Sequence, residues 1–185
     1  MFIQTETTPN PATLKFLPGH AVLKGGTRDF RDAGEAGAVS PLAARLFEID
    51  GVTGVFLGSD FVSVTKNGGE WQHLTPAVLG AIMEHFLSGE PVLFAGGDAA
   101  SSGEDFDAKD AEVVAAIKEL IETRVRPAVA NDGGDIIFHG YRAGTVYLKM
   151  HGACSGCPSS TATLRNGIEN LLKHFIPEVE SVQAV

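Results

Sequence analysis

The sequence is poor in cysteine, tryptophan and basic residues. Its 185 residues include 2 Cys, 1 Trp and only 14 Lys and Arg, against 23 Asp and Glu, so the formal net charge is -9. This charge argues against nucleic acid as a partner, because binding to phosphates requires clusters of Lys and Arg. No apolar run approaches the roughly 18 to 20 residues that span a bilayer, so we expect no membrane partner either.

Targeting signals are also lacking at the N-terminus. The opening residues contain neither the basic and apolar regions of a signal peptide nor the Arg-rich, acid-poor character of a transit peptide. We therefore expect an intracellular protein, and more specifically a bacterial cytosolic one, with a processed mitochondrial form as the alternative. In a reducing compartment a pair of cysteines is metal-binding or redox-active rather than a structural disulfide.

The composition is otherwise that of a globular protein, with 44% apolar and 20% charged residues. The length suits two small domains, because domains commonly hold roughly 50 to 200 residues. Residues 95–112 (AGGDAASSGEDFDAKDAE) are small and acidic and show no apolar periodicity, which indicates a flexible linker. We predict one domain over 1–94, an acidic linker over 95–108 and a second domain over 109–185.

The first domain is predicted to contain strands, a hairpin and two capped helices. Ser40-Pro41 and Thr75-Pro76 each indicate a helix start, and Gly89 indicates a helix end. Alternating apolar and polar residues predict strands over 2–7, 13–17, 52–57 and 61–66, whereas 18–39 stays unassigned. The second helix should bury Val78, Leu79, Ile82, Met83, Phe86 and Leu87.

The first domain contains no cysteine, and its histidines are scattered without the spacing of metal ligands. These histidines are His20, His73 and His85. We therefore expect this domain to recognise partners or to support a dimer, and not to carry chemistry.

The second domain is predicted to have the order α-β-β-α-β. The pattern indicates a helix over 111–125 that ends near Pro127, strands over 136–141 and 145–150, a helix that begins at Pro158, and a strand over 179–185. Two helices should cover one face of the sheet. The expected fold class is α+β, with two small α/β sandwich domains and a Cys-x-x-Cys loop between a strand and a helix of the second.

Both cysteines, Cys154 and Cys157, lie in the loop HGACSGCPSST (151–161). Pro158 suits the first helical position, which places Cys157 at or beside the N-cap. There the free N–H groups and the helix dipole favour a thiolate and can lower a cysteine pKa from about 8.5 into roughly the 3.5 to 7.5 range. We expect both sulfurs to be reactive.

Three chemistries fit such a loop. A thioredoxin-like dithiol oxidoreductase is disfavoured, because only one helix and one short strand follow Cys157. A structural zinc site needs four ligands. His151 could be a third ligand, but it is more simply interpreted as a surface or packing residue. If two copies meet across a two-fold axis, their cysteine pairs supply the four thiolates that an iron–sulfur cluster needs. The same geometry would accept zinc, so the metal stays open at this point.

Several segments of the chain resemble the Nfu family of iron–sulfur cluster carriers. Residues 126–129 (RPAV), 132–135 (DGGD) and 151–161 are similar to the NifU-like C-terminal domain of that family. Residues 1–11 (MFIQTETTPNP) and 14–16 (LKF) are similar to its separate N-terminal domain. The resemblance covers nearly the whole chain outside the linker.

The resemblance implies a non-enzymatic scaffold that acts as a homodimer or larger homo-oligomer. Such a carrier holds a [4Fe-4S] cluster between subunits, with [2Fe-2S] as the alternative, and Cys154 and Cys157 would be its ligands. It receives the cluster from upstream assembly proteins and delivers it to apo-enzymes such as lipoate synthases.

The remaining polar residues around the loop have simpler interpretations. Residues 131–135 (NDGGD) indicate a turn before a strand, rather than an anion or calcium site. Ser159, Ser160 and Thr161 are expected to satisfy the first helical turn, although hydrogen bonds to cluster sulfides are an alternative. Arg126 and Arg165 are expected to form surface ion pairs rather than to offset cluster charge.

Overall fold

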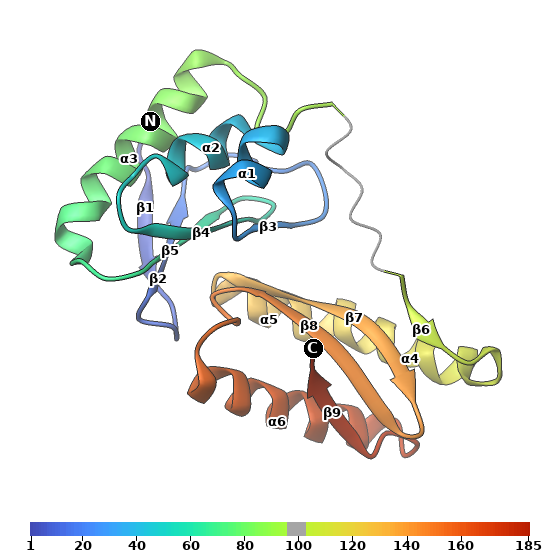
Figure 1. Ribbon diagram of the computed structural model, residues 1–185. Coiled ribbons are helices and arrows are strands. Elements are labelled where there is room, and N and C mark those ends of the chain that lie inside the picture. Colours follow the sequence, from blue (N-terminus) through green and yellow to red (C-terminus); the bar gives the residue numbers. More distant parts are fainter. Residues whose placement is uncertain (96–102) are drawn as a thin grey trace. The chain divides into compact units, whose positions relative to one another are not determined.

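The computed structural model describes residues 1–95 and 103–185. The chain divides into two compact units, Met1–Ala100 and Ser101–Val185 (Figure 1). Each unit combines helices with one sheet, which confirms the predicted α+β class. Residues 96–102 of the predicted linker lie outside the described residues.

The N-terminal unit is a five-stranded antiparallel sheet in the order β1-β2-β5-β4-β3, with three helices packed on one face. Phe16, Leu57, Leu42 and Ile82 are fully buried in the core between sheet and helices. The strands are β1 (Gln4–Thr7), β2 (Thr13–Leu17), β3 (Arg28–Phe30), β4 (Val52–Leu57) and β5 (Val62–Lys66), and the helices are α1 (Ala33–Val39), α2 (Pro41–Phe47) and α3 (Trp71–Ser88). Strand β3 and helix α1 occupy the segment that the sequence left unassigned.

Local capping signals set several helix ends. The Ser40 hydroxyl accepts a hydrogen bond from the Ala43 N–H at 3.1 Å, and Pro41 occupies the first helical position. Gly89 follows α3 in the left-handed conformation, with φ +74°. These three predicted signals are confirmed.

The predicted start of α3 at Thr75-Pro76 is wrong, because the helix begins at Trp71 and contains Pro76. A proline inside a helix removes one backbone hydrogen bond. Tertiary contacts hold the first turn nevertheless: the Trp71 indole N–H donates to the Pro11 carbonyl at 3.1 Å, and Leu74 is buried.

The predicted apolar face of α3 is wrong at two positions. Met83 is 37% exposed and Leu87 is 75% exposed. The buried residues of α3 instead include Val78, Ile82 and His85. The histidine was not part of the predicted apolar face.

The C-terminal unit is a four-stranded sheet in the order β6-β7-β8-β9. The pair β7·β8 is antiparallel, whereas β6 and β9 run parallel to their neighbours. The strands are β6 (Asp105–Phe106), β7 (Gly134–Arg142), β8 (Thr145–Gly152) and β9 (Ser181–Ala184), and the helical segments are η1 (Ala108–Asp110), α4 (Ala111–Leu120), η2 (Ile121–Val125), α5 (Arg126–Asn131) and α6 (Pro158–Phe175). The helices α4 and α6 bury Ile117 and Leu172 in one core with Ile136 and Leu148 of the sheet.

The prediction that Pro127 ends the first helix of this unit is wrong. The chain continues from α4 through the π-helical turn η2 into α5, which ends at Asn131. In the wider turn the Arg126 N–H donates to the Ile121 carbonyl, five residues back. Pro127 then stands in the first turn of α5, where a missing N–H is tolerated.

The predicted linker over 95–108 is wrong at its C-terminal end, because Asp105–Phe106 forms strand β6. This strand pairs with Gly140 and Tyr141 of β7. The Phe106 ring lies 6.4 Å from the Phe138 ring in an edge-to-face arrangement. The Phe106 ring thus helps to anchor this acidic segment to the sheet.

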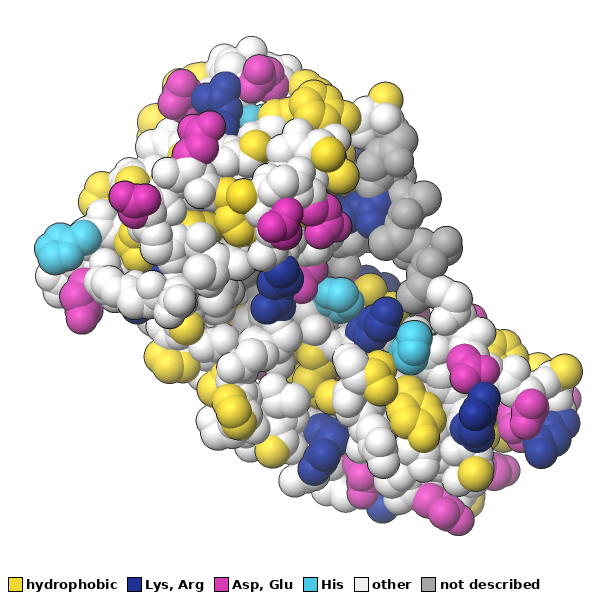
Figure 2. All heavy atoms as spheres, in the orientation of Figure 1, with side chains coloured by type: hydrophobic (Ala, Val, Ile, Leu, Met, Phe, Trp, Pro, Cys, Tyr) yellow, Lys and Arg dark blue, Asp and Glu magenta, His cyan; other side chains and the backbone are white. Residues whose placement is uncertain are grey.

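The surface carries side chains of both charges. On the face shown in Figure 2, acidic and basic side chains of the described residues are intermixed rather than gathered into one basic surface. Among the described residues, no helix has both the length and the apolar character needed to cross a bilayer.

Candidate functional site

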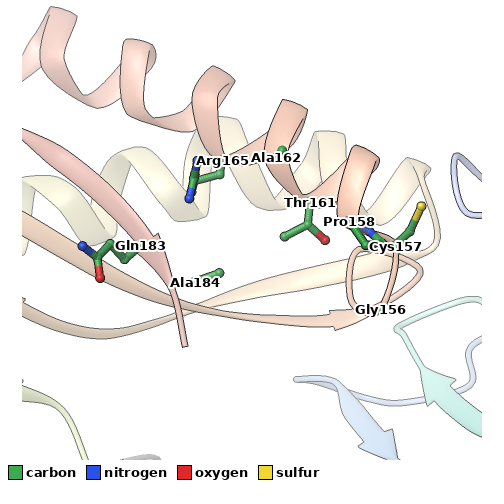
Figure 3. Close-up of a pocket in the computed structure, with 8 residues that line it drawn as sticks. All are labelled: Gly156, Cys157, Pro158, Thr161, Ala162, Arg165, Gln183 and Ala184. Atoms are coloured by element: carbon green, nitrogen blue, oxygen red, sulfur yellow. The ribbon is translucent and has the colours of Figure 1, made fainter.

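The cysteine loop joins the end of β8 to the start of α6. Cys154 and Cys157 are both free, but Cys154 is only 5% exposed and belongs to the core of the unit, whereas Cys157 is partly exposed. Figure 3 shows Cys157 beside the first turn of α6, at one end of a pocket of about 460 Å³ that extends to Gln183 and Ala184 of β9. The two sulfurs therefore lie in different environments.

Cys157 is the N-cap residue of α6, which confirms the predicted position. Whether its sulfur faces the N–H groups of the first turn stays a prediction. The sulfur lies 3.4 Å from the Ser159 hydroxyl. A partly exposed sulfur at this position is accessible to a ligand that approaches the helix N-terminus.

Cys154 contradicts the expectation that both sulfurs are reactive. Burial raises the pKa of its thiol to about 12, and the nearby carboxylates of Asp132 and Asp135 add to the rise. A buried group is harder to ionise because the charged form loses its hydration. The thiolate is the reactive form of cysteine, so Cys154 is the protected member of the pair.

The backbone of the loop turns at two glycines. Gly152 has φ +63° and Gly156 has φ +84°, values that other residues rarely adopt. The Thr161 hydroxyl donates to the Cys154 carbonyl at 3.0 Å, and the Thr161 N–H donates to the Cys157 carbonyl at 2.9 Å. Thr161 therefore ties both cysteines to the first turn of α6, as the expected structural role requires.

A second segment lies against the loop. Helix α5 ends at Asn131, Gly133 has φ +79°, and β7 begins at Gly134, which confirms the predicted turn before a strand. The Gly133 carbonyl accepts a hydrogen bond from the Ala153 N–H at 3.2 Å. A side chain at Gly134 would place its Cβ only 2.6 Å from the Cys154 sulfur.

The polar residues near the loop differ in their contacts. Arg126 forms an ion pair, as predicted, but its partner Asp135 is buried and not on the surface. Arg165 is exposed and lines the pocket beside Cys157. His151 lies in β8 opposite Asp135 in the strand register.

Sequence reasoning missed the contact of residues 133–135 with Cys154. The one available signal was an Asp followed by the apolar run Ile136 to Phe138, since a charged residue in such a strand needs a partner.

Among the described residues, the cysteine pair does not belong to a larger cluster of metal-ligating side chains. In the part of the chain that the structure describes, no three His, Cys, Asp or Glu side chains are placed to hold a metal ion. Within the described residues the two thiols therefore have no third ligand of these types beside them.

Two family models match the chain in succession. The model described as "Scaffold protein Nfu/NifU N terminal" matches residues 3–89, and the model described as "NifU-like domain" matches residues 117–183. Each match falls within one of the two units of the structure.

Curated relatives match over the entire chain. A Drosophila erecta protein named "NFU1 iron-sulfur cluster scaffold homolog, mitochondrial" is 54% identical over 188 residues, which cover 100% of this chain and 65% of that protein. The Homo sapiens protein of the same name is 50% identical over 187 residues and is covered to 72%. A NifU-like protein from Saccharomyces cerevisiae, solved by NMR, is 25% identical with a TM-score of 0.46, and the match covers 51% of this chain and 86% of that one.

The fold and the site define an α+β protein of two units, the second of which carries a pair of free thiols between a strand and a helix. The chain belongs to the Nfu family of scaffold proteins. It spans 65% of the length of the Drosophila erecta relative. Both relatives are named as mitochondrial proteins, which gives no support to the bacterial cytosol that the sequence suggested.

Proposed function

We propose that the chain is a scaffold and carrier of iron–sulfur clusters, and that two copies hold one [4Fe-4S] cluster through Cys154 and Cys157 of each. The observation that carries this proposal is the pair of free thiols in one loop, in a chain whose described residues offer no third ligand nearby. Two copies supply the four thiolates that such a cluster requires. Membership of the Nfu family and the names of the relatives support iron–sulfur cargo over zinc.

The unequal burial of the two thiols suits a cargo that is taken up and released. Cys157 is the accessible ligand, and the positive end of the α6 dipole stabilises negative charge beside it. Cys154 must lose its proton to bind iron, and its raised pKa makes this loss depend on the metal. A cluster gripped half by each chain is freed when the two copies separate, which favours transfer over permanent storage.

The partners follow from this role. Upstream assembly proteins would supply the cluster, and apo-proteins with free cysteine ligands would receive it. The N-terminal unit would recognise these partners or support the dimer. The chain itself would catalyse no covalent reaction, and the mitochondrial matrix is the location that we propose from the names of its relatives.

Anaerobic reconstitution with ferrous iron and sulfide tests the proposal. We expect a coloured dimer with about four irons per two chains, because four thiolates bind one [4Fe-4S] cluster. About two irons per dimer would indicate [2Fe-2S] instead. The Cys154→Ser and Cys157→Ser variants should each remain colourless and free of iron. A wild-type chain that stays a colourless monomer, or a dimer that holds only zinc, would contradict the proposal.

The dithiol oxidoreductase remains as a different class, and the burial of Cys154 argues against it. Thiol–disulfide exchange requires a thiolate that can reach its substrate, whereas the pKa of Cys154 is raised to about 12. Disulfide reductase activity in the iron-free chain, lost in Cys154→Ser, would favour that class instead.

A further inference from the structure

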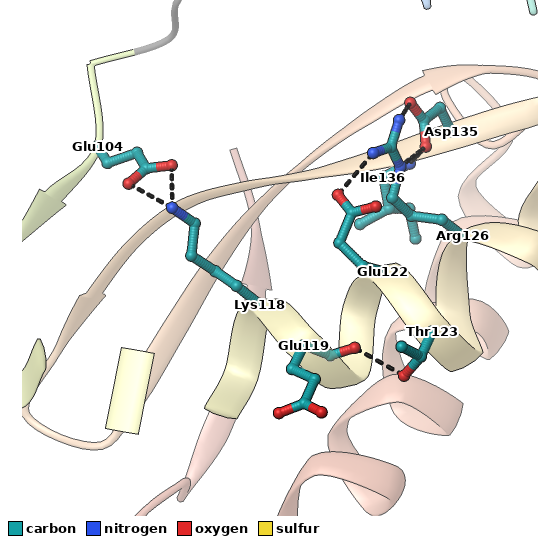
Figure 4. Close-up of polar contacts among 8 residues, drawn as sticks. All are labelled: Glu104, Lys118, Glu119, Glu122, Thr123, Arg126, Asp135 and Ile136. Carbon is teal, nitrogen blue, oxygen red and sulfur yellow. Dashed lines mark hydrogen bonds and ion pairs between the residues drawn. The ribbon is translucent and has the colours of Figure 1, made fainter. Parts of the chain in front are cut away.

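The ion pair between Arg126 and the buried Asp135, beside the cysteine loop, is bidentate. Arg126 donates through Nε and Nη2 to the two carboxylate oxygens of Asp135, each at 2.7 Å, while its Nη1 donates to Glu122 at 2.6 Å (Figure 4). The Asp135 side chain is only 4% exposed. Its Oδ1 also accepts the N–H of Ile136 at 2.8 Å. These hydrogen bonds fix the Asp135 carboxylate at the start of β7.

A short path connects this carboxylate to Cys154. Asp135 follows Gly134, and a Cβ at Gly134 would lie 2.6 Å from both the Cys154 sulfur and the His151 carbonyl oxygen. Asp135 also pairs with His151 in the register of β7 and β8. The backbone at Gly134 therefore packs closely against the Cys154 sulfur. A shift of Asp135 would move its neighbour Gly134 away from the sulfur.

The π-helical turn η2 sets the side of the helix from which Arg126 projects. Each residue of an α-helix advances by about 100° around the axis, so the extra residue in this turn changes the direction of every side chain that follows. Arg126 comes directly after the turn and reaches Asp135 from there. Turns of this kind occur frequently at functional sites.

We propose that Arg126 is a positioning residue for cluster binding, which acts by holding Asp135 and thereby the backbone at Gly134 against the sulfur of Cys154. This inference rests on the proposed function for its consequence, which is that the Arg126–Asp135 pair sets how long the cargo is retained. The positioning itself exists in the iron-free chain. Loss of Arg126 removes two hydrogen bonds and an opposite charge from the buried Asp135 carboxylate. The backbone at Gly134 is then held less firmly, and Cys154 becomes accessible.

Alkylation of Cys154 in the iron-free chain measures the positioning directly. In the full chain with Cys157→Ser, Cys154 is the only remaining thiol, and mass spectrometry gives its rate of reaction with iodoacetamide. We expect Arg126→Gln and Asp135→Asn to raise this rate by about tenfold or more without denaturant. Matched controls are Glu122→Gln, which removes the other partner of Arg126, and Arg142→Gln, which removes an exposed pair with Asp105 in the same unit.

The denaturant dependence of alkylation separates positioning from a general loss of stability. If the pair only stabilises the fold, the rate in each variant will follow its free energy of unfolding, and this result would overturn the inference. If Arg126→Gln does not fold, Arg126→Lys carries the test, since lysine keeps the charge but loses the bidentate contact. A rate in Arg126→Lys equal to that of the Glu122→Gln control would also overturn it.

Cluster retention tests the consequence in chains with both cysteines. The half-life of the loaded dimer in the presence of a chelator should fall about threefold or more in Arg126→Lys and stay within about twofold of wild type in Arg142→Gln. Equal half-lives would overturn the inference. If the wild type takes up no iron, the proposed function fails, but the alkylation rates still decide whether Arg126 positions Cys154.

Discussion

At the scale of single residues, Cys154 and Cys157 have different structural roles although they share one loop. Cys154 contacts the core of the C-terminal unit, whereas Cys157 caps a helix at the surface. A ligand that is also a core residue links cargo binding to the stability of the fold.

Serine substitutions should separate these roles in the iron-free chain. We expect Cys154→Ser to lower the free energy of unfolding of the C-terminal unit by about 1 to 3 kcal/mol, because it buries a hydroxyl in place of an apolar sulfur. Cys157→Ser should change it by less than about 0.5 kcal/mol. Denaturant unfolding followed by circular dichroism checks both values. Equal effects of the two substitutions would contradict the difference in burial.

At the scale of helices and strands, the sequence predicts those helix ends that depend on neighbouring residues. It does not predict those that depend on tertiary packing. Ser40, Gly89 and the start of α6 at Pro158 follow from capping chemistry that involves only neighbouring residues. Pro76 and Pro127 misled the prediction, because a proline is tolerated inside a helical segment when packing or a π-helical turn compensates for its missing N–H.

At the candidate site, too, the sequence predicts the local arrangement but not the tertiary contacts. The spacing of Cys154 and Cys157 and the position of Pro158 placed the thiols at a strand–helix junction. The burial of Cys154 could not be predicted, because it depends on Gly134 in a strand that is distant in sequence. Contacts between segments that the chain brings together only on folding leave no periodic pattern within either segment.

Helix α3 carries a buried histidine that should make the N-terminal unit sensitive to acid. His85 is fully buried, and in the described residues neither of its ring nitrogens has a hydrogen-bond partner. Burial lowers the pKa of His85 below its ordinary 6.5, and the positive charge of Arg45 lowers it further, although Glu90 opposes this. The unfolded chain then binds a proton that the folded chain does not, so stability falls as the pH drops below about 6.5.

Replacement of His85 should remove this dependence. We expect the free energy of unfolding of wild type to decrease between pH 7 and pH 5 by at most about 1.4 kcal/mol per pH unit for one proton. In His85→Leu the decrease should be smaller, while His73→Leu, at an exposed position of the same helix, should behave as wild type. Fluorescence of Trp71, the single tryptophan, follows the unfolding of this unit alone. An unchanged pH dependence in His85→Leu would exclude His85 as its source.

At the scale of the whole molecule, the chain contains two separate hydrophobic cores and one pair of thiols. One core gathers Phe16, Leu42 and Ile82, and the other gathers Ile117 and Leu148, with no residue in common. A domain with its own core can fold alone. All the ligands that we propose lie in the second unit, so cluster binding should not require the first.

A pair of fragments tests this independence and the position of the domain boundary. We expect residues 103–185 to fold and to take up the same amount of iron per chain as the full chain. Residues 109–185 should be less stable by about 1 to 2 kcal/mol, because they lack the Phe106 ring that packs on Phe138 and the Glu104 carboxylate that pairs with Lys118 at 2.6 Å.

Denaturant unfolding followed by circular dichroism compares the two fragments, and Phe106→Ala in the longer one isolates the aromatic contribution. If residues 103–185 did not fold, the second core would depend on the first unit, and the cluster site would have to be understood in the full chain. If 109–185 were as stable as 103–185, strand β6 would contribute nothing to the free energy of unfolding. The second domain would then begin at residue 109, as the acidic composition predicts. The packing of Phe106 against the sheet favours the earlier boundary.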